Sequence, residues 1–172
     1  MVIDAQLRLF GNSATSDDVT NETDRILMMH LRSMADLVIT DAATAAAEGY
    51  NPSKFCEIEV WSRSGDFRGV SEAKAEGSKF GVSLQVVSDA ATRIASLRKK
   101  RESILLETGP TLTKLLAENR QIDLACISVT GASSAIEALD SLEIFSKQLG
   151  LTYLSNSGHD WFNETLFARF QR

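Results

Sequence analysis

The sequence has few of the residues that cross-link small proteins through disulfides or bind metals. It has two cysteines and two prolines among 172 residues, and aromatic side chains make up only 7% of it. Cys56 and Cys126 fall in separate strand-like segments, without a CxxC spacing or a histidine cluster. The sequence therefore predicts neither a metal site nor a disulfide framework, and two free thiols suit the reducing cytoplasm.

Positive charge and long apolar runs are also scarce. Lys and Arg number 18 against 23 Asp and Glu, which gives a formal net charge of −5. The electrostatic attraction that dominates nucleic-acid binding is therefore missing. No apolar run approaches the roughly 20 residues that a membrane span requires, and the opening "MVIDAQLRLF" is not typical of a signal peptide. We expect neither nucleic acid nor a membrane as partner.

Motifs for nucleophilic or metal-assisted catalysis are missing as well. The sequence contains no GxSxG, HExxH or GxxxxGK[ST]. His30 falls in a predicted amphipathic helix and His159 in the predicted loop of a hairpin, so a packing or surface role is the simpler interpretation of each. Hydrolytic and P-loop functions therefore have no support in the sequence.

The patterns that are present alternate between strands and helices. A strand is predicted over 2–10 and a helix after Thr20 or Asn21. Strand–helix units follow over 36–50, 82–102, 103–119 and 122–149, and a surface loop lies at 66–81. Alternation of this kind predicts a mostly parallel sheet in a three-layer α/β/α fold, closed by a C-terminal antiparallel hairpin. The length and the hydrophobic content of 44% fit a single domain over 1–172.

The turns after the predicted strands are the candidate ligand contacts, because ligands bind at the carboxyl ends of parallel strands. In "ETGPTL", Gly109 allows close backbone approach, Pro110 suits a first helical position, and Thr108 and Thr111 supply hydroxyls. This pattern is typical of a phosphate-contacting turn. The plain alternative is that Thr-Gly-Pro only ends a strand and begins a helix.

Two stretches resemble a known family. "LRSMADLVITDAATAAAEGYNP" at 31–52 and "ILLETGPTLTKLLAENRQIDLACISVTG" at 104–131 are similar to the reductase domain of the bifunctional riboflavin-biosynthesis deaminase-reductase. The resemblance implies a dihydrofolate-reductase-like fold, an NADPH cofactor and a homodimer. It also implies a small-molecule substrate, a phosphoribosylamino-pyrimidine that receives hydride at its sugar carbon.

The resemblance also assigns site residues by position. The residues expected to contact the cofactor are Thr44, Arg63, Ser64, Thr108, Gly109, Pro110, Thr111 and Leu112. Glu107 and Asn12 match positions associated with the substrate. Arg63 would hold a ribose phosphate through bidentate contacts, and backbone N–H groups of the glycine turn would suit phosphate.

Several positions depart from the family's pattern. Asp41, Ala43 and Thr108 stand where the family has glycine, and "RLFGN" at 8–12 places Phe10 and Asn12 where the family has Asp and Lys. Two hypotheses therefore remain. The chain is an NADPH-dependent pyrimidine or pterin-type reductase, or it is a non-catalytic relative that kept the fold as a ligand-binding or dimerisation module.

Overall fold

The computed structural model describes the chain except for residues 10–15, 50–52 and 71–79. The chain forms two compact units, one of residues 1–27 with 116–172 and one of residues 28–115. Each unit contains its own four-stranded sheet. The single domain expected over 1–172 stays a prediction, and we describe the two units separately.

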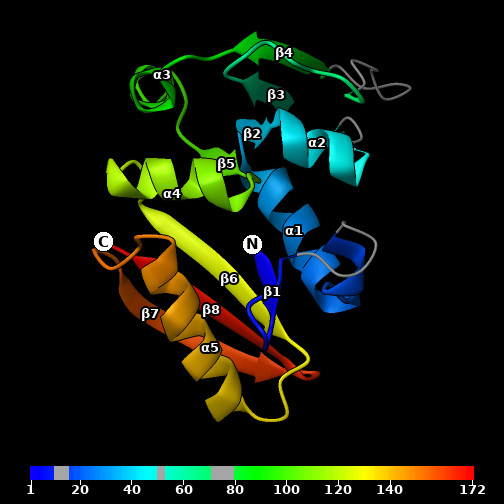
Figure 1. Cartoon of the computed structure of the whole chain (residues 1–172), viewed down its shortest axis with the longest axis vertical. Coiled ribbons are helices and arrows are strands. Elements are labelled where there is room, and N and C mark those ends of the chain that lie inside the picture. The colour runs from blue at the N-terminus through cyan, green and yellow to red at the C-terminus, as the bar shows by residue number, and fades with distance from the viewer. Residues whose placement is uncertain (10–15, 50–52, 71–79) are drawn as a thin grey trace. The chain divides into compact units, whose positions relative to one another are not determined.

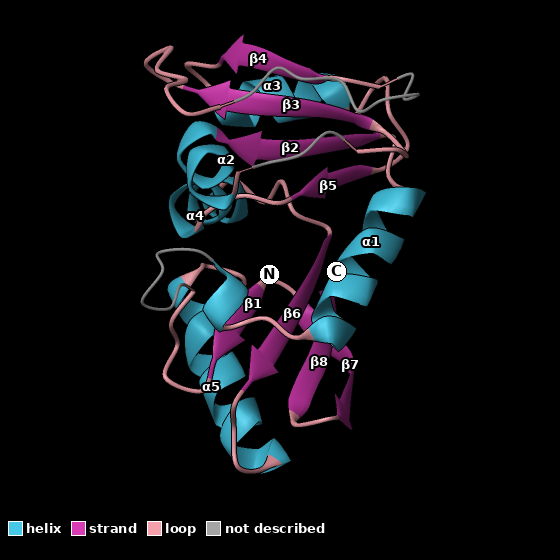
Figure 2. Ribbon diagram, turned by 90° about the vertical axis from the view of Figure 1, so that its right-hand side faces the viewer, coloured by secondary structure: helices cyan, strands magenta, loops and turns pink. Residues whose placement is uncertain are grey.

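The 28–115 unit contains a sheet in which every strand is parallel to its neighbours. Its strands are β2 (Leu37–Asp41), β3 (Glu57–Ser62), β4 (Val82–Val86) and β5 (Ile104–Leu106), in the spatial order β4-β3-β2-β5 (Figure 2). The helices between strands are α2 (Ala42–Glu48) and α3 (Ala90–Leu97), and α4 (Pro110–Glu118) begins after β5. The alternation of parallel strands with helices is what the sequence pattern predicted.

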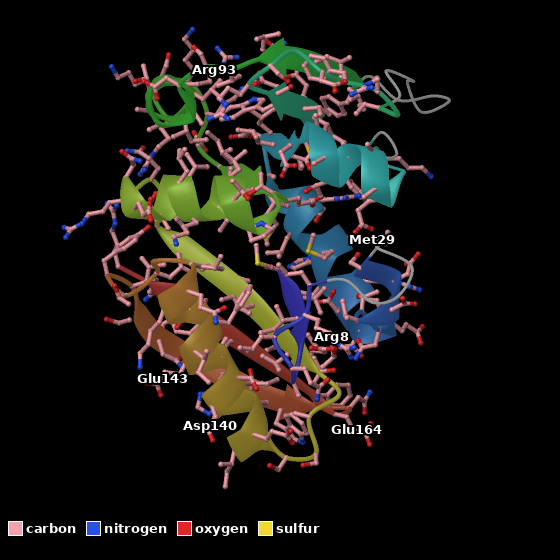
Figure 3. All side chains as sticks on the ribbon, viewed as in Figure 1. Arg8, Met29, Arg93, Asp140, Glu143 and Glu164 are labelled. Atoms are coloured by element: carbon pink, nitrogen blue, oxygen red, sulfur yellow. The ribbon has the colours of Figure 1, made fainter. Side chains whose placement is uncertain are left out.

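The two faces of this sheet are covered by different helices. Ile58 and Val60 of β3 are fully buried in a cluster that includes Ala45 of α2. Glu59 points to the opposite face, because side chains alternate along a strand, and it accepts a hydrogen bond from Arg93. Arg93 belongs to α3 and is labelled in Figure 3. Layers of helix therefore lie on both faces, as the three-layer prediction requires.

The other unit contains a mixed sheet. Its strands are β1 (Val2–Asp4), β6 (Leu124–Thr130), β7 (Ser155–Phe162) and β8 (Thr165–Gln171), in the order β1-β6-β8-β7. β1 is parallel to β6, whereas β8 runs antiparallel to both β6 and β7. α5 (Ala135–Gln148) packs on β6 and β8 (Figure 1), and a short 3-10 helix spans Ser16–Asp18. The predicted fold class, with its C-terminal hairpin, is confirmed.

Three local predictions change in the structure. The first strand is shorter than the predicted 2–10, because Asp4 turns the chain by accepting hydrogen bonds from the N–H groups of Gln6 and Arg8. His159 lies in strand β7 and not in a hairpin loop, since the turn is formed by Asn163 and Glu164 with positive φ. The expected single sheet is two sheets of four strands.

α1 (Glu22–Met34) begins where capping chemistry predicted it. Asn21 Oδ1 accepts a hydrogen bond from Asp24 N at 3.0 Å, so Asn21 rather than Thr20 caps the backbone.

In the described part of the chain, no helix has the length and apolar character needed to cross a membrane.

Candidate functional site

The candidate cofactor residues gather at one edge of the parallel sheet. β2, β3 and β5 are parallel neighbours, so their carboxyl ends lie at the same edge. Asp41 ends β2, Arg63 follows β3, and Glu107 follows β5 with its N–H bonded to Ile39 O at 2.9 Å. The structure therefore brings together the predicted residues from 44 to 112, all within the 28–115 unit.

The Asp41 carboxylate is the centre of this edge. Its Oδ1 accepts a hydrogen bond from Thr44 N at 2.9 Å, which caps α2. Its Oδ2 accepts two more, from Thr44 Oγ1 at 2.9 Å and from Gly109 N at 2.7 Å. One carboxylate thus satisfies three donors and ties the turn after β2 to the turn after β5.

Gly109 is required at this position by close approach. A Cβ placed on it would lie 3.1 Å from Thr44 Oγ1 and 3.3 Å from Asp41 Oδ2. Both neighbours are held by their own hydrogen bonds, so they have little freedom to move away. The glycine therefore serves the contact with Asp41, and the expected contact of Gly109 with a cofactor stays a prediction.

Thr108 contributes to the fold around the same turn. Its hydroxyl lies 2.8 Å from that of Thr113, and both side chains are buried. α4 then begins at Pro110, as predicted, with Thr111 exposed and Leu112 half-buried. These contacts agree with the plain interpretation of Thr-Gly-Pro as the start of a helix, and they leave Thr111 as the accessible hydroxyl of the turn.

Glu107, the predicted substrate residue, forms a two-pronged ion pair. Arg32 of α1 donates from Nε to Oε1 at 2.7 Å and from Nη2 to Oε2 at 2.5 Å. The Glu107 side chain is only 5% exposed and that of Arg32 is 28% exposed. The hydrogen bond to Glu107 raises the pKa of Arg32 above its ordinary value, although burial acts in the opposite direction.

The sequence did not predict that Arg32 and Asp41 take part in the candidate site. Arg32 lies in the stretch that resembles the riboflavin reductases, which was a usable signal, but its partner lies 75 residues further along the chain. Asp41 caps α2, and nothing local in the sequence indicated its bond to Gly109.

Arg63 and Ser64 lie in the turn after β3, and both are exposed. Ser64 Oγ lies 3.4 Å from Ser62 Oγ and accepts a hydrogen bond from Asp66 N at 3.3 Å. Within the described ranges, the Arg63 side chain has no hydrogen bond or ion pair. By contrast Arg68 is paired with Asp66 and lowers the pKa of that carboxyl to about 2.

Asn12, the second predicted substrate residue, lies outside the described residues, as does Phe10. Across the ranges that the structure describes, no group of three or more His, Cys, Asp or Glu side chains is placed to hold a metal ion.

Comparison with known proteins identifies the architecture. The sequence matches no protein-family model and no curated protein. Among solved structures, a pyrimidine reductase-like protein from Corynebacterium diphtheriae matches 99% of this chain and 88% of its own, with a TM-score of 0.66 and 15% identity. The chain has the fold of the dihydrofolate-reductase-like reductases.

Two further structures with this reductase fold match 99% of the chain at 10% identity. One is a diaminohydroxyphosphoribosylaminopyrimidine deaminase and 5-amino-6-(5-phosphoribosylamino)uracil reductase from Thermotoga maritima, with a TM-score of 0.64, and the chain spans 54% of its length. The other is dihydrofolate reductase from Enterococcus faecalis in complex with NADP(H), matched over 92% of its length with a TM-score of 0.61. The fold implied by the sequence resemblance is confirmed.

One of these structures is a complex with NADP(H), and the turns of this chain differ in how well they would fit the phosphates of such a dinucleotide. The turn after β3 fits a phosphate, since it presents an exposed guanidinium and a serine hydroxyl. The turns after β2 and β5 do not fit one as they stand, because the Asp41 carboxylate already holds the N–H groups of Thr44 and Gly109.

Proposed function

We propose that this chain is an NADPH-dependent reductase of a phosphoribosylamino-pyrimidine or a related pyrimidine or pterin compound, as in riboflavin biosynthesis. The observation that carries the proposal is the reductase fold, which matches the pyrimidine reductase-like protein over 99% of the chain. A homodimer, implied by the sequence resemblance, and a cytoplasmic location, which the two free thiols suit, are part of the proposal.

The chemistry asks little of the protein's own side chains. NADPH supplies the hydride, so the protein needs no nucleophile and must mainly align the two reactants. The absence of hydrolase motifs is therefore consistent with the proposal. Arg63 would bind the ribose phosphate that distinguishes NADPH from NADH, because a guanidinium makes paired hydrogen bonds to phosphate.

The Arg32–Glu107 pair would have a positioning role at the same edge. Its two short bonds fix the carboxylate at the end of β5, next to the turn that begins α4. Because both carboxylate oxygens accept from Arg32 and the Glu107 side chain is only 5% exposed, the pair would act by holding this turn in place beneath the ligand.

The test is an assay of nicotinamide oxidation with the phosphoribosylamino-pyrimidine, together with a fluorescence titration of NADPH and NADH. We expect saturable binding with a preference for NADPH. Arg63→Ala should weaken NADPH binding about tenfold or more, the equivalent of one charge-assisted hydrogen bond, and leave NADH binding unchanged. Arg68→Ala is the matched control, since Arg68 is a nearby exposed arginine already paired with Asp66.

The competing hypothesis is a non-catalytic relative with this fold. One observation favours it, namely that the carboxylates of Asp41 and Glu107 are both satisfied by the protein itself. No binding of NADPH to the unmodified protein at millimolar concentration would contradict the reductase proposal and favour this alternative. Turnover of NADPH with a pyrimidine would exclude it.

A further inference from the structure

The chain contains two copies of the tetrapeptide Asp-Ala-Ala-Thr, at 41–44 and 89–92. Each aspartate caps a helix in the same way. Asp89 accepts from Thr92 N at 3.0 Å and from Thr92 Oγ1 at 2.7 Å, as Asp41 does with the corresponding groups of Thr44. The copy at 89–92 therefore shows the contacts that this tetrapeptide makes when its aspartate acts only as a helix cap.

Asp41 differs from Asp89 by one contact. It also accepts the N–H of Gly109, at 2.7 Å, from a segment 68 residues away in sequence. Asp89 is exposed, whereas Asp41 is half-buried against the turn that follows β5. The extra contact is unrelated to the capping of α2, so it needs its own explanation.

The donors around Asp41 are those that a phosphate oxygen would use. Backbone N–H groups at the carboxyl ends of parallel strands bind anions, and a glycine at such a turn admits close approach because it lacks a Cβ. Here a carboxylate of the chain is the anion, with three donors within 2.9 Å of its oxygens. A phosphate approaching this edge would lose those donors and meet a negative charge.

We propose that Asp41 sets the cofactor affinity of this site as an internal anion that competes with a phosphate of the dinucleotide for the N–H of Gly109 and the donors of Thr44. The inference rests on the proposed function for the identity of the ligand. The competition itself concerns any phosphate or pyrophosphate group that reaches this edge of the sheet.

The test compares the unmodified protein with Asp41→Gly and Asp41→Ser. Serine removes the charge and still caps α2 through Thr44 N, but its side chain is too short to hold Gly109 as well, so this variant guards against loss of the fold. Asp89→Gly is the matched control. Circular dichroism would verify that each protein is folded before its affinity is measured.

Two ligands are titrated, NADPH by nicotinamide fluorescence and inorganic pyrophosphate by the NMR shift of the Gly109 amide. We expect both Asp41 variants to bind NADPH at least tenfold more tightly than the unmodified protein, and Asp89→Gly to bind it equally. We also expect pyrophosphate to shift the Gly109 amide in the Asp41 variants at concentrations that leave the unmodified protein unchanged.

The two readouts separate failure of this inference from failure of the proposed function. If the unmodified protein binds NADPH and the Asp41 variants bind it no more tightly, the inference is overturned. If no protein binds NADPH but pyrophosphate binds only the variants, the competition stands and the reductase proposal fails. If neither ligand binds any of the proteins, both are overturned.

Discussion

Replacing the two equivalent aspartates with alanine measures how strongly Asp41 ties the turns together. Asp41→Ala removes a helix cap, which costs about 1 kcal/mol. It also removes the bond from Gly109 N to a charged acceptor, which contributes about 1.5–3 kcal/mol. We therefore expect Asp41→Ala to lower the free energy of unfolding by about 2.5–4 kcal/mol.

Asp89→Ala provides the internal reference for this prediction. It removes the same capping bonds to Thr92 N and Thr92 Oγ1, and among the described residues Asp89 has no bond to a distant turn like that of Asp41 to Gly109. We expect a clearly smaller loss of stability than for Asp41→Ala, with the difference reporting the Gly109 bond. The assay is urea unfolding followed by circular dichroism, with equal slopes required for the comparison. Equal losses in the two variants would refute the assigned role of Asp41.

Three other changes test neighbouring contacts by urea unfolding. Gly109→Ala places a Cβ against Thr44 Oγ1 and should cost about 1–3 kcal/mol by overpacking; an unchanged midpoint would contradict this. Arg32→Met leaves the buried carboxylate of Glu107 unpaired and should cost about 3 kcal/mol, partly recovered by adding Glu107→Gln; no recovery would count against the ion pair. The Asp36 carboxylate accepts from the N–H groups of Ser103 and Glu102, which lowers its pKa, so its stabilisation should be complete above pH 3.8 and lost as the pH falls through the folded value; an identical acid profile for Asp36→Asn would contradict this.

The element order could be predicted from the sequence because local rules decide it. The alternation of strand and helix patterns, the cap at Thr20 or Asn21, and Pro110 at the first position of α4 are each readable within a few residues. The resemblance to the riboflavin reductases then identified the fold, which the solved structures confirm at 10–15% identity.

The candidate site was less predictable because its decisive contacts join distant segments. Gly109 lies 68 residues from Asp41 and Glu107 lies 75 residues from Arg32, and no periodicity links either pair. The sequence shows that Asp41 replaces a glycine of the family, but it does not show which N–H and O–H groups donate to the Asp41 carboxylate. The predicted length of β1 was wrong for a similar reason. The strand ends at Asp4 because the Asp4 side chain accepts hydrogen bonds from the N–H groups of Gln6 and Arg8.

The most direct test of the central claim is a ¹H–¹⁵N NMR titration with NADPH that follows the backbone amides of Thr44, Gly109 and Thr92. In Asp41→Ser, we expect NADPH to shift the amides of Thr44 and Gly109 and to leave that of Thr92 in place. In the unmodified protein, the same shifts should need at least tenfold more cofactor. Binding of NADPH that leaves Thr44 and Gly109 unshifted in both proteins would contradict a cofactor site at this edge of the sheet.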